Sequence, residues 1–256
     1  MRNKSPMDFQ SAFRGKVVVV VGGTSGIGKQ VVCDLNQLGA HLIVVGKDDT
    51  KLKALRNDID NIDTINIDVS KRNKCIVLAN DIKKKQTRID NLVVSAGIFE
   101  PGSIEDTDSN IWDKSLNINL SAVFWVIKSL YELLCKSNQS SIVVVSSILA
   151  HYGSSVTHAY CAAKGGLSAL VKSMAIELSN SNVRINSVSP GHVDTKMIEE
   201  IINDNDKRVA IEKLYPLKRI GKTTDISALI IFLLSNYSSW ITGSDYIIDG
   251  GRSAQV

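Results

Sequence analysis

The stretch that decides the fold is Lys16-Val-Val-Val-Val-Val-Gly-Gly-Thr-Ser-Gly-Ile-Gly28. Five consecutive valines predict a strand that is buried on both faces, because β-branched apolar residues fit a sheet covered on each side. Glycines follow at once, and the chain then has the apolar spacing of an amphipathic helix to about residue 38. A buried strand that enters a helix through a glycine-rich turn predicts the first unit of a parallel α/β sheet.

The remaining sequence repeats this alternation. Further strands are expected at residues 41–45, 64–67, 91–94, 141–146, 183–188 and 245–248, and helices at 50–59, 71–86, 109–136, 155–179 and 224–235. We therefore predict one doubly wound, Rossmann-type domain over residues 15–256, with a seven-stranded parallel sheet and helices on both faces. A helical insertion near 194–216 is expected at the substrate, and residues 1–14 are expected to form a flexible arm.

Composition narrows the classes of function. The chain has 256 residues with 30 Lys and Arg against 26 Asp and Glu, and this small excess does not predict a nucleic-acid partner. The four cysteines lie in predicted helices without metal-ligand spacing or a secretory leader, so we expect no metal and a cytoplasmic location. Apolar stretches fall short of the roughly 20 residues that cross a bilayer, so no membrane role is expected.

The glycine turn is a candidate phosphate site. Glycines let the backbone turn sharply and approach a pyrophosphate, while free amides at the helix N-terminus hold the anion. The spacing is G-x-x-x-G-x-G, which differs from G-x-G-x-x-G, and a tight structural turn is the alternative interpretation. The candidate residues are Gly22, Thr24, Ser25, Gly26, Ile27 and Gly28.

The end of the second predicted strand bears on the choice of cofactor. Many dinucleotide enzymes place a carboxylate there for the ribose hydroxyls, but this chain has Gly46 followed by Lys47. A cation facing a ribose 2′-phosphate favours NADP(H), whereas an ordinary exposed lysine with Asp48 nearby leaves NAD(H) open. Asp68 and Val69, after the third strand, are candidates for the adenine edge or for a surface turn.

Proton-transfer chemistry is indicated by Tyr160 and Lys164, which share one helix face at i, i+4. A neighbouring ammonium favours the phenolate, so the tyrosine is a candidate general acid or base. Ser147 lies thirteen residues earlier, at the end of a predicted buried strand. Its hydroxyl is expected to reach the same crevice and to stabilise a developing oxyanion.

On these motifs the chain resembles the short-chain dehydrogenase/reductase family from residue 16 to residue 251, and it is similar to the 3-oxoacyl-reductase-like members. The resemblance implies a catalytic set of Asn119, Ser147, Tyr160 and Lys164, in which Asn119 supports a water-linked proton relay. It also implies a homotetramer or a dimer. Further cofactor contacts are implied at Ser95, Ala96, Gly97, Tyr160, Lys164, Pro190, Gly191, Val193 and Thr195.

Two departures from the family pattern keep other functions open. Val21 stands where the family usually has Thr, and Val94 where it usually has Asn. We predict an NADP(H)-dependent reductase or dehydrogenase of a small carbonyl or alcohol. A catalytically weak nucleotide-binding regulator and an NAD-dependent alcohol dehydrogenase are the alternatives.

The positions flanking the catalytic motifs predict the border of the substrate pocket. Ordinary loop packing is an equal interpretation for each histidine among them. The candidates are His151, Tyr152, His192 and Tyr215.

Overall fold

The computed structural model describes residues 7–60 and 62–255. Its seven strands form one parallel sheet in the order β3-β2-β1-β4-β5-β6-β7, which confirms the predicted doubly wound architecture. The strands are β1 (Val17–Val21), β2 (His41–Gly46), β3 (Ile62–Asn66), β4 (Asn91–Val94), β5 (Ser140–Val145), β6 (Val183–Pro190) and β7 (Asp245–Ile248).

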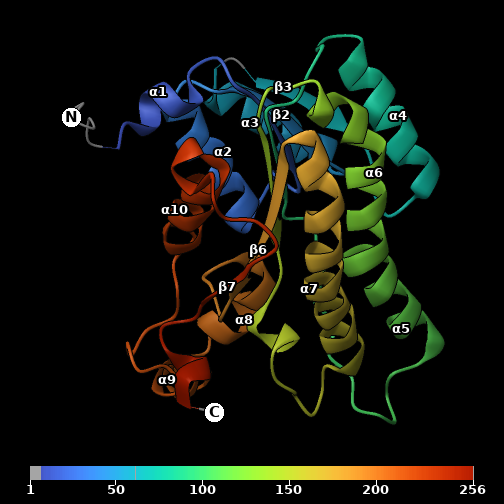
Figure 1. The fold of residues 1–256 in the computed structure, drawn as a ribbon. Helices are drawn as coiled ribbons and strands as arrows, with labels where there is room; N and C mark the ends of the chain where they lie inside the picture. Colours follow the sequence, from blue (N-terminus) through green and yellow to red (C-terminus); the bar gives the residue numbers. More distant parts are fainter. Residues whose placement is uncertain (1–6, 61, 256) are drawn as a thin grey trace.

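Helices cover both faces of this sheet (Figure 1). One face carries α4 (Arg72–Lys83), α5 (Ser109–Leu116), α6 (Ala122–Cys135) and α7 (His158–Leu178). The other carries α2 (Gly26–Gln37), α3 (Asp49–Asp58) and α10 (Thr223–Leu234). The expected helical insertion is present as α8 (Glu199–Ile202) and α9 (Asn205–Lys213).

Strand β1 shows why an all-valine run suits the centre of the sheet. Val17, Val19 and Val21 belong to the apolar cluster beneath α4, α6 and α7. Val18 and Val20 point the other way, into the cluster beneath α2 and α10. A strand buried on both faces has no position for a polar side chain, so the usual alternation of apolar and polar residues is absent.

The N-terminal segment differs from the expected arm. Residues 1–6 lie outside the described part of the chain, but Phe9–Phe13 forms helix α1, whose N-cap Asp8 accepts a hydrogen bond from the Ser11 amide. The Phe13 side chain is only 1% exposed and packs in the cluster of α2 and β2. Burial of this aromatic ring offsets the conformational entropy that the segment loses when it is ordered. The local sequence does not show that the ring is buried, because the contact is with distant segments.

The direction in which successive strands are added to the sheet reverses between β1 and β4, which are neighbours near its centre. From β1 the chain winds outward through β2 to β3, and from β4 it winds the opposite way to β7. In such sheets a crevice opens at the carboxyl ends of the strands where the order reverses. Here that point lies beside Gly22 and Ser95, which directly follow the two strands.

One helical segment, Ser109–Cys135, is long and apolar enough to cross a membrane by length and composition. Its α6 part buries seven side chains and packs against α4, which accounts for the apolar composition. A core helix passes the same test, so this segment alone is weak evidence for a membrane span.

Candidate active site

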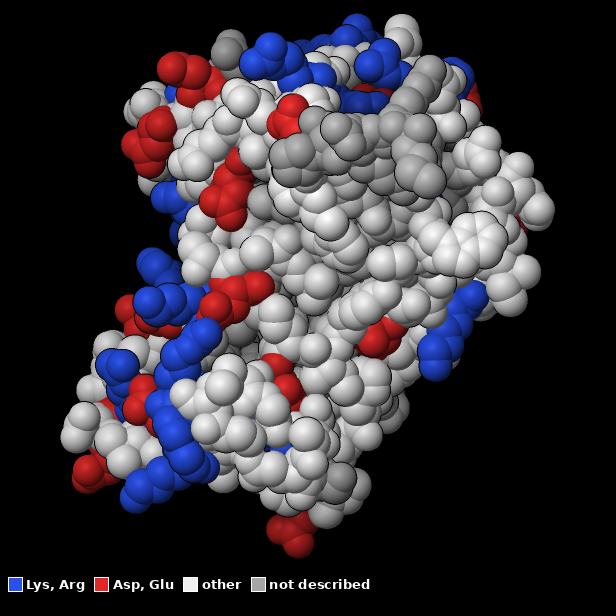
Figure 2. Space-filling model, turned by 60° about the vertical axis from the view of Figure 1, so that its left-hand side comes forward, with Lys and Arg blue, Asp and Glu red and all other residues white. Residues whose placement is uncertain are grey.

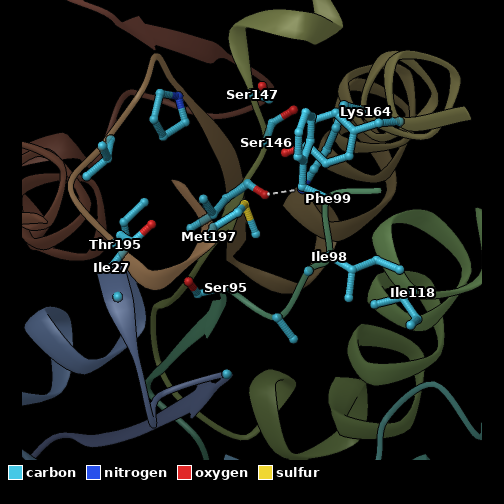
Figure 3. A pocket seen from close by; sticks show the side chains of 18 of the residues that line it. Ile27, Ser95, Ile98, Phe99, Ile118, Ser146, Ser147, Lys164, Thr195 and Met197 are labelled. Carbon is cyan, nitrogen blue, oxygen red and sulfur yellow. Dashed lines mark hydrogen bonds between the residues drawn. The ribbon is translucent and has the colours of Figure 1, made fainter. Parts of the chain in front are cut away.

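A cavity of about 720 Å³ opens at the carboxyl ends of the central strands. Ser147 and Lys164 lie on one side of it, and Ile27 and Thr195 on the other (Figure 3). The residues predicted to bind the cofactor line this cavity except Gly28, and Asn119 is the catalytic candidate that does not line it.

Two glycines of the turn after β1 are required by close backbone contacts. Gly22 has a φ of +82°, and a Cβ there would lie 2.5 Å from the Ala96 amide nitrogen. A Cβ on Gly28 would lie 2.3 Å from the Gly22 carbonyl oxygen. Gly28 therefore shapes the turn from behind and does not face the cavity.

Helix α2 presents its N-terminus to the cavity. Ser25 is its N-cap, and the Ser25 side chain makes no capping hydrogen bond. Ser25, Gly26 and Ile27 line the cavity, so the first amides of a twelve-residue helix face this space. Unused amides and the positive end of the helix dipole favour an anion at that place.

The far end of the cavity holds charges of both signs. Lys47, Lys51 and Asp68 line it. Asp48 is occupied as the N-cap of α3, where it accepts a hydrogen bond from the Lys51 amide at 3.1 Å. Asp68 accepts hydrogen bonds from the Ser70 hydroxyl (2.7 Å) and amide (3.1 Å). Although burial opposes it, these bonds and the charge of Lys47 hold the pKa of Asp68 below its ordinary value.

At the reactive end, the structure brings Ser147, Tyr160 and Lys164 to one wall of the cavity. Tyr160 is 7% exposed, and the Ser147 hydroxyl lies close enough to its phenol to lower the pKa of that phenol. The Lys164 ammonium lies 5.6 Å from the centre of the Tyr160 ring and donates to the Val145 carbonyl at 2.8 Å. The ring of Phe99 meets that of Tyr160 edge-on at 5.2 Å.

The expected lowering of the Tyr160 pKa is not what the structure gives. Burial raises the pKa of Tyr160 to about 12, and the nearby Ser147 hydroxyl opposes this only in part. Burial also lowers the pKa of Lys164 to about 8, with Asp245 opposing that change. The i, i+4 spacing predicts that the two side chains are near each other, but not that both lose water, which disfavours each charged form.

Asn119 lies one layer behind this wall and is fully buried. Its side chain forms two hydrogen bonds of 3.1 Å with the backbone of Ile98, one from the Ile98 amide and one to the Ile98 carbonyl. The residue belongs to a π-helical turn, Asn117–Ser121, between α5 and α6. Asn119 therefore fixes the loop after β4, from which Ile98 and Phe99 enter the cavity.

The Pro190–Thr195 segment closes the cavity beside the glycine turn that follows β1. Pro190, Gly191, Val193 and Thr195 all line the cavity. A bridge between Val193 and Gly221 holds the segment, and the Thr195 side chain lies 3.1 Å from where a Cβ on Gly26 would be. Two segments that are both expected to contact the cofactor are thus neighbours.

Two of the four substrate candidates line the cavity, Tyr152 and His192. His151 does not, because its ring turns toward the Asp245 carboxylate at 3.1 Å and the Ser189 hydroxyl at 3.3 Å. Tyr215 does not either. It is 2% exposed, and its hydroxyl meets Nδ1 of His192 at 2.5 Å, so it supports the residue that faces the cavity.

Sequence reasoning missed several residues of the cavity wall. Apolar side chains come from the loop after β4 and from the helical insertion, and one cation comes from the end of the chain. The predicted helical insertion indicated that some of its residues contact the substrate, but which side chains face the cavity depends on tertiary packing. The missed residues include Ile98, Phe99, Ile118, Leu149, Val156, Met197, Ile201 and Arg252.

The two departures from the family pattern are core residues. Val21 and Val94 are neighbours in the β1–β4 pairing and are 1% and 2% exposed. Within residues 7–60 and 62–255, no group of three or more His, Cys, Asp or Glu is placed to hold a metal ion. The four cysteines are free thiols, and burial raises the pKa of Cys75 to about 11.

Comparison with known proteins agrees with this geometry. Residues 21–253 match the family model described as "Enoyl-(Acyl carrier protein) reductase". The 3-oxoacyl-[acyl-carrier-protein] reductase of Thermotoga maritima is 33% identical over 241 residues, 93% of this chain and 97% of that protein. Cyclopentanol dehydrogenase of Comamonas sp. is 30% identical over 243 residues, 93% of this chain and 97% of that protein.

Solved structures are similar over almost the whole chain. A short-chain type dehydrogenase/reductase from Mycobacterium ulcerans has a TM-score of 0.91 at 27% identity and covers 95% of this chain and 91% of its own. The NADP complex of RhlG from Pseudomonas aeruginosa has a TM-score of 0.92 at 26% identity, with 96% and 99% covered.

Proposed function

The chain belongs to the short-chain dehydrogenase/reductase family, and from this premise we propose that it is a cytoplasmic NADP(H)-dependent oxidoreductase. It moves a hydride between the nicotinamide ring and a ketone or secondary alcohol of a small molecule. The observation that carries the proposal is the single cavity that joins the glycine turn after β1 to Ser147, Tyr160 and Lys164. A dinucleotide laid across such a turn has its reactive end beside the phenol.

The residues present fit a dinucleotide. Gly22 gives space where any side chain would collide with the backbone after β4, and the open amides of α2 suit a pyrophosphate. Val193 and Thr195 would hold the nicotinamide carboxamide, and Lys164 the adjoining ribose. When bound, the cofactor supplies the hydride, and the protein supplies position and electrostatics.

Tyr160 acts as the proton donor in the reductive direction. With a pKa near 12, its hydroxyl keeps the proton at neutral pH and can give it to a carbonyl oxygen that gains negative charge. The Ser147 hydroxyl, which lines the same wall, turns its single O–H to that oxygen and donates a second hydrogen bond to it. The Lys164 ammonium stabilises the phenolate that remains. These protonation states favour reduction of a ketone over oxidation of an alcohol near neutral pH.

Preference for NADP(H) rests on Lys47. Asp48 is occupied in capping α3 and pairs with Lys51 at 3.4 Å, so its carboxylate is turned to the helix. Asp68 is held by Ser70. Lys47, which is not paired with a carboxylate in the described part of the chain, is then our candidate for the cation that faces a ribose 2′-phosphate, and NAD(H) remains the alternative cofactor.

The substrate is proposed to be a small free molecule. The relatives include a reductase named for carrier-bound substrates and a dehydrogenase named for cyclopentanol. On the face shown in Figure 2, basic and acidic side chains are interspersed. The segment 196–222 carries seven Lys and Arg and five Asp and Glu, so it lacks the one-sided charge that an acidic carrier would favour.

A homotetramer is proposed, with α5 to α7 as candidate contact helices. Exposed apolar side chains on these helices are consistent with this. Trp112 is 41% exposed, and Ile176 is 78% exposed.

The test is oxidation of NADPH with a broad panel of ketones, including a carrier-mimicking thioester, for the native protein and Tyr160→Phe. We expect turnover to fall to near background in the variant, because only the proton donor is removed, while NADPH binding stays within about twofold. Equal loss of turnover and binding would mean a structural tyrosine. Tight NADPH binding without turnover of any ketone would favour the regulator.

A further inference from the structure

Arg252 brings a half-buried cation to the substrate side of the cavity. It follows β7 and begins a short 3-10 turn, Arg252–Gln255, and it lines the cavity together with Tyr152. Its Nε donates to the Tyr152 hydroxyl at 2.9 Å, and its guanidinium lies 5.8 Å and 5.7 Å from the rings of Tyr152 and Tyr215. Two aromatic rings and one hydrogen bond therefore fix the plane of the group.

The described part of the chain provides neither a hydrogen-bond acceptor for Nη1 of this guanidinium nor a carboxylate to balance its charge. Nη1 of Arg252 is buried and has no hydrogen-bond partner in the described part of the chain. Within residues 7–60 and 62–255, no carboxylate lies within 4 Å of the group. Asp249 is close in sequence, but its two oxygens accept the amides of Gly251 (3.0 Å) and Ser253 (2.7 Å).

The other titratable neighbour adds no negative charge. Burial, together with the charge of Arg252, lowers the pKa of His192 to about 4, so this ring is neutral at physiological pH. Tyr215 is hydrogen-bonded to that ring, and burial raises the pKa of its hydroxyl, so the phenol is neutral too. A buried N–H group without an acceptor, on a cation without a neighbouring anion, is costly, which indicates that a ligand supplies the missing charge.

Arg252 is linked to the reactive wall through Tyr152, which follows Ser147 after the short turn Ile148–Ala150. Apolar Leu149, Val156 and Met197 line the same cavity. We propose that Arg252 binds a carboxylate of the substrate, so that the protein reduces an oxo acid to a hydroxy acid. This inference rests on the proposed function. A carboxylate fits because its oxygens accept N–H groups of the guanidinium, and its single charge is balanced by that one cation.

The experiment uses matched oxo acids, their methyl esters and phosphate-terminated analogues, with one to four methylenes between the carbonyl and the charged group. We compare kcat/KM for native protein, Arg252→Gln and Arg252→Lys. Arg208→Gln is the matched control, because Arg208 is an exposed cation that pairs with Glu212 on α9 and does not line the cavity. Binding without turnover is read from thermal stabilisation of the NADPH complex by each acid.

For the native protein we expect the best acid to exceed its ester in kcat/KM by about tenfold or more, the effect of one charge-assisted pair. Arg252→Gln abolishes this ratio and the stabilisation by acids, and Arg252→Lys restores the ratio in part. Arg208→Gln keeps the ratio and leaves ester turnover and NADPH binding within about twofold. Acid-to-ester ratios that are equal in native protein and Arg252→Gln overturn the proposal, as does preference for the phosphate analogue. If no ketone turns over but acid-selective stabilisation depends on Arg252, the anion site stands and the proposed function fails.

Discussion

Lys164 is expected to titrate far below an ordinary lysine. It is 4% exposed, and burial lowers its pKa from 10.5 to about 8. A shift of that size corresponds to about 3 kcal/mol against the charged form. The side chain is then about nine-tenths protonated at pH 7 and about one-tenth at pH 9. Since the protonated lysine stabilises the Tyr160 phenolate left by reduction, kcat/KM for NADPH should fall about tenfold between pH 7 and pH 9.

The pH profile of kcat/KM for NADPH reports groups of the free protein and is measured from pH 6 to 10 with a saturating ketone. Lys164→Arg keeps a positive charge over this range, so the alkaline fall should disappear even if overall activity is lower. NMR of lysines labelled at Cε gives the titration directly, with one resonance near pH 8 that Lys164→Arg lacks. A Lys164 resonance that titrates near 10.5, or an alkaline fall that persists in Lys164→Arg, would refute the reasoning.

Three further variants test other parts of the structure. Gly22→Ala should lower the free energy of unfolding, measured in urea, by about 2–4 kcal/mol, because its φ is positive and the new Cβ would overlap Ala96. Gly15→Ala is the control, since Gly15 has a φ of +70° but nothing within 4 Å, so only the cost of the positive φ should appear; an equal loss in both variants would contradict the overlap. Lys47→Ala should lower the NADPH-to-NADH affinity ratio about tenfold in fluorescence titrations, whereas Lys53→Ala, which removes an exposed cation of α3 paired with Asp49, should not; an unchanged ratio would remove the case for a 2′-phosphate site. His192 has a pKa of about 4 against an ordinary 6.5, so protonation of the unfolded state should remove up to about 3 kcal/mol of stability as pH falls from 6.5 to 4; unfolding of His192→Asn should lack this part of the pH dependence, and identical profiles would show that His192 is not its source.

The fold was predictable because its signals are local. Five valines followed by glycines specify a buried strand and its turn within a dozen residues, and the structure places β1 at Val17–Val21. The i, i+4 spacing of Tyr160 and Lys164 likewise fixes a shared helix face. The ends of the elements differ from the prediction by a few residues; for example, the helix expected at 155–179 is α7, His158–Leu178. Hydrogen bonding in the first and last turns decides where a helix begins and ends.

The parts that could not be predicted depend on contacts between distant segments. Tyr152 and Arg252 are a hundred positions apart in the chain, and no pattern in either neighbourhood indicates their hydrogen bond. His151 turns away from the cavity because Asp245 lies on a different strand. The pKa of Tyr160 follows from the loss of water around the folded wall, which spacing alone does not report.

The π-helical turn at Asn117–Ser121 makes the length of this segment critical. A π-turn holds one residue more than the α-helical turn it replaces, so deleting a single residue there would let α5 and α6 join as one regular helix. Since both kinds of turn complete one revolution, the parts of α5 and α6 outside the turn would keep their phase. Asn119 lies inside the turn, so its side chain would lose the position from which it is hydrogen-bonded to Ile98 and Ser115. The extra residue thus lets one side chain leave the regular helical path while both helices keep their packing.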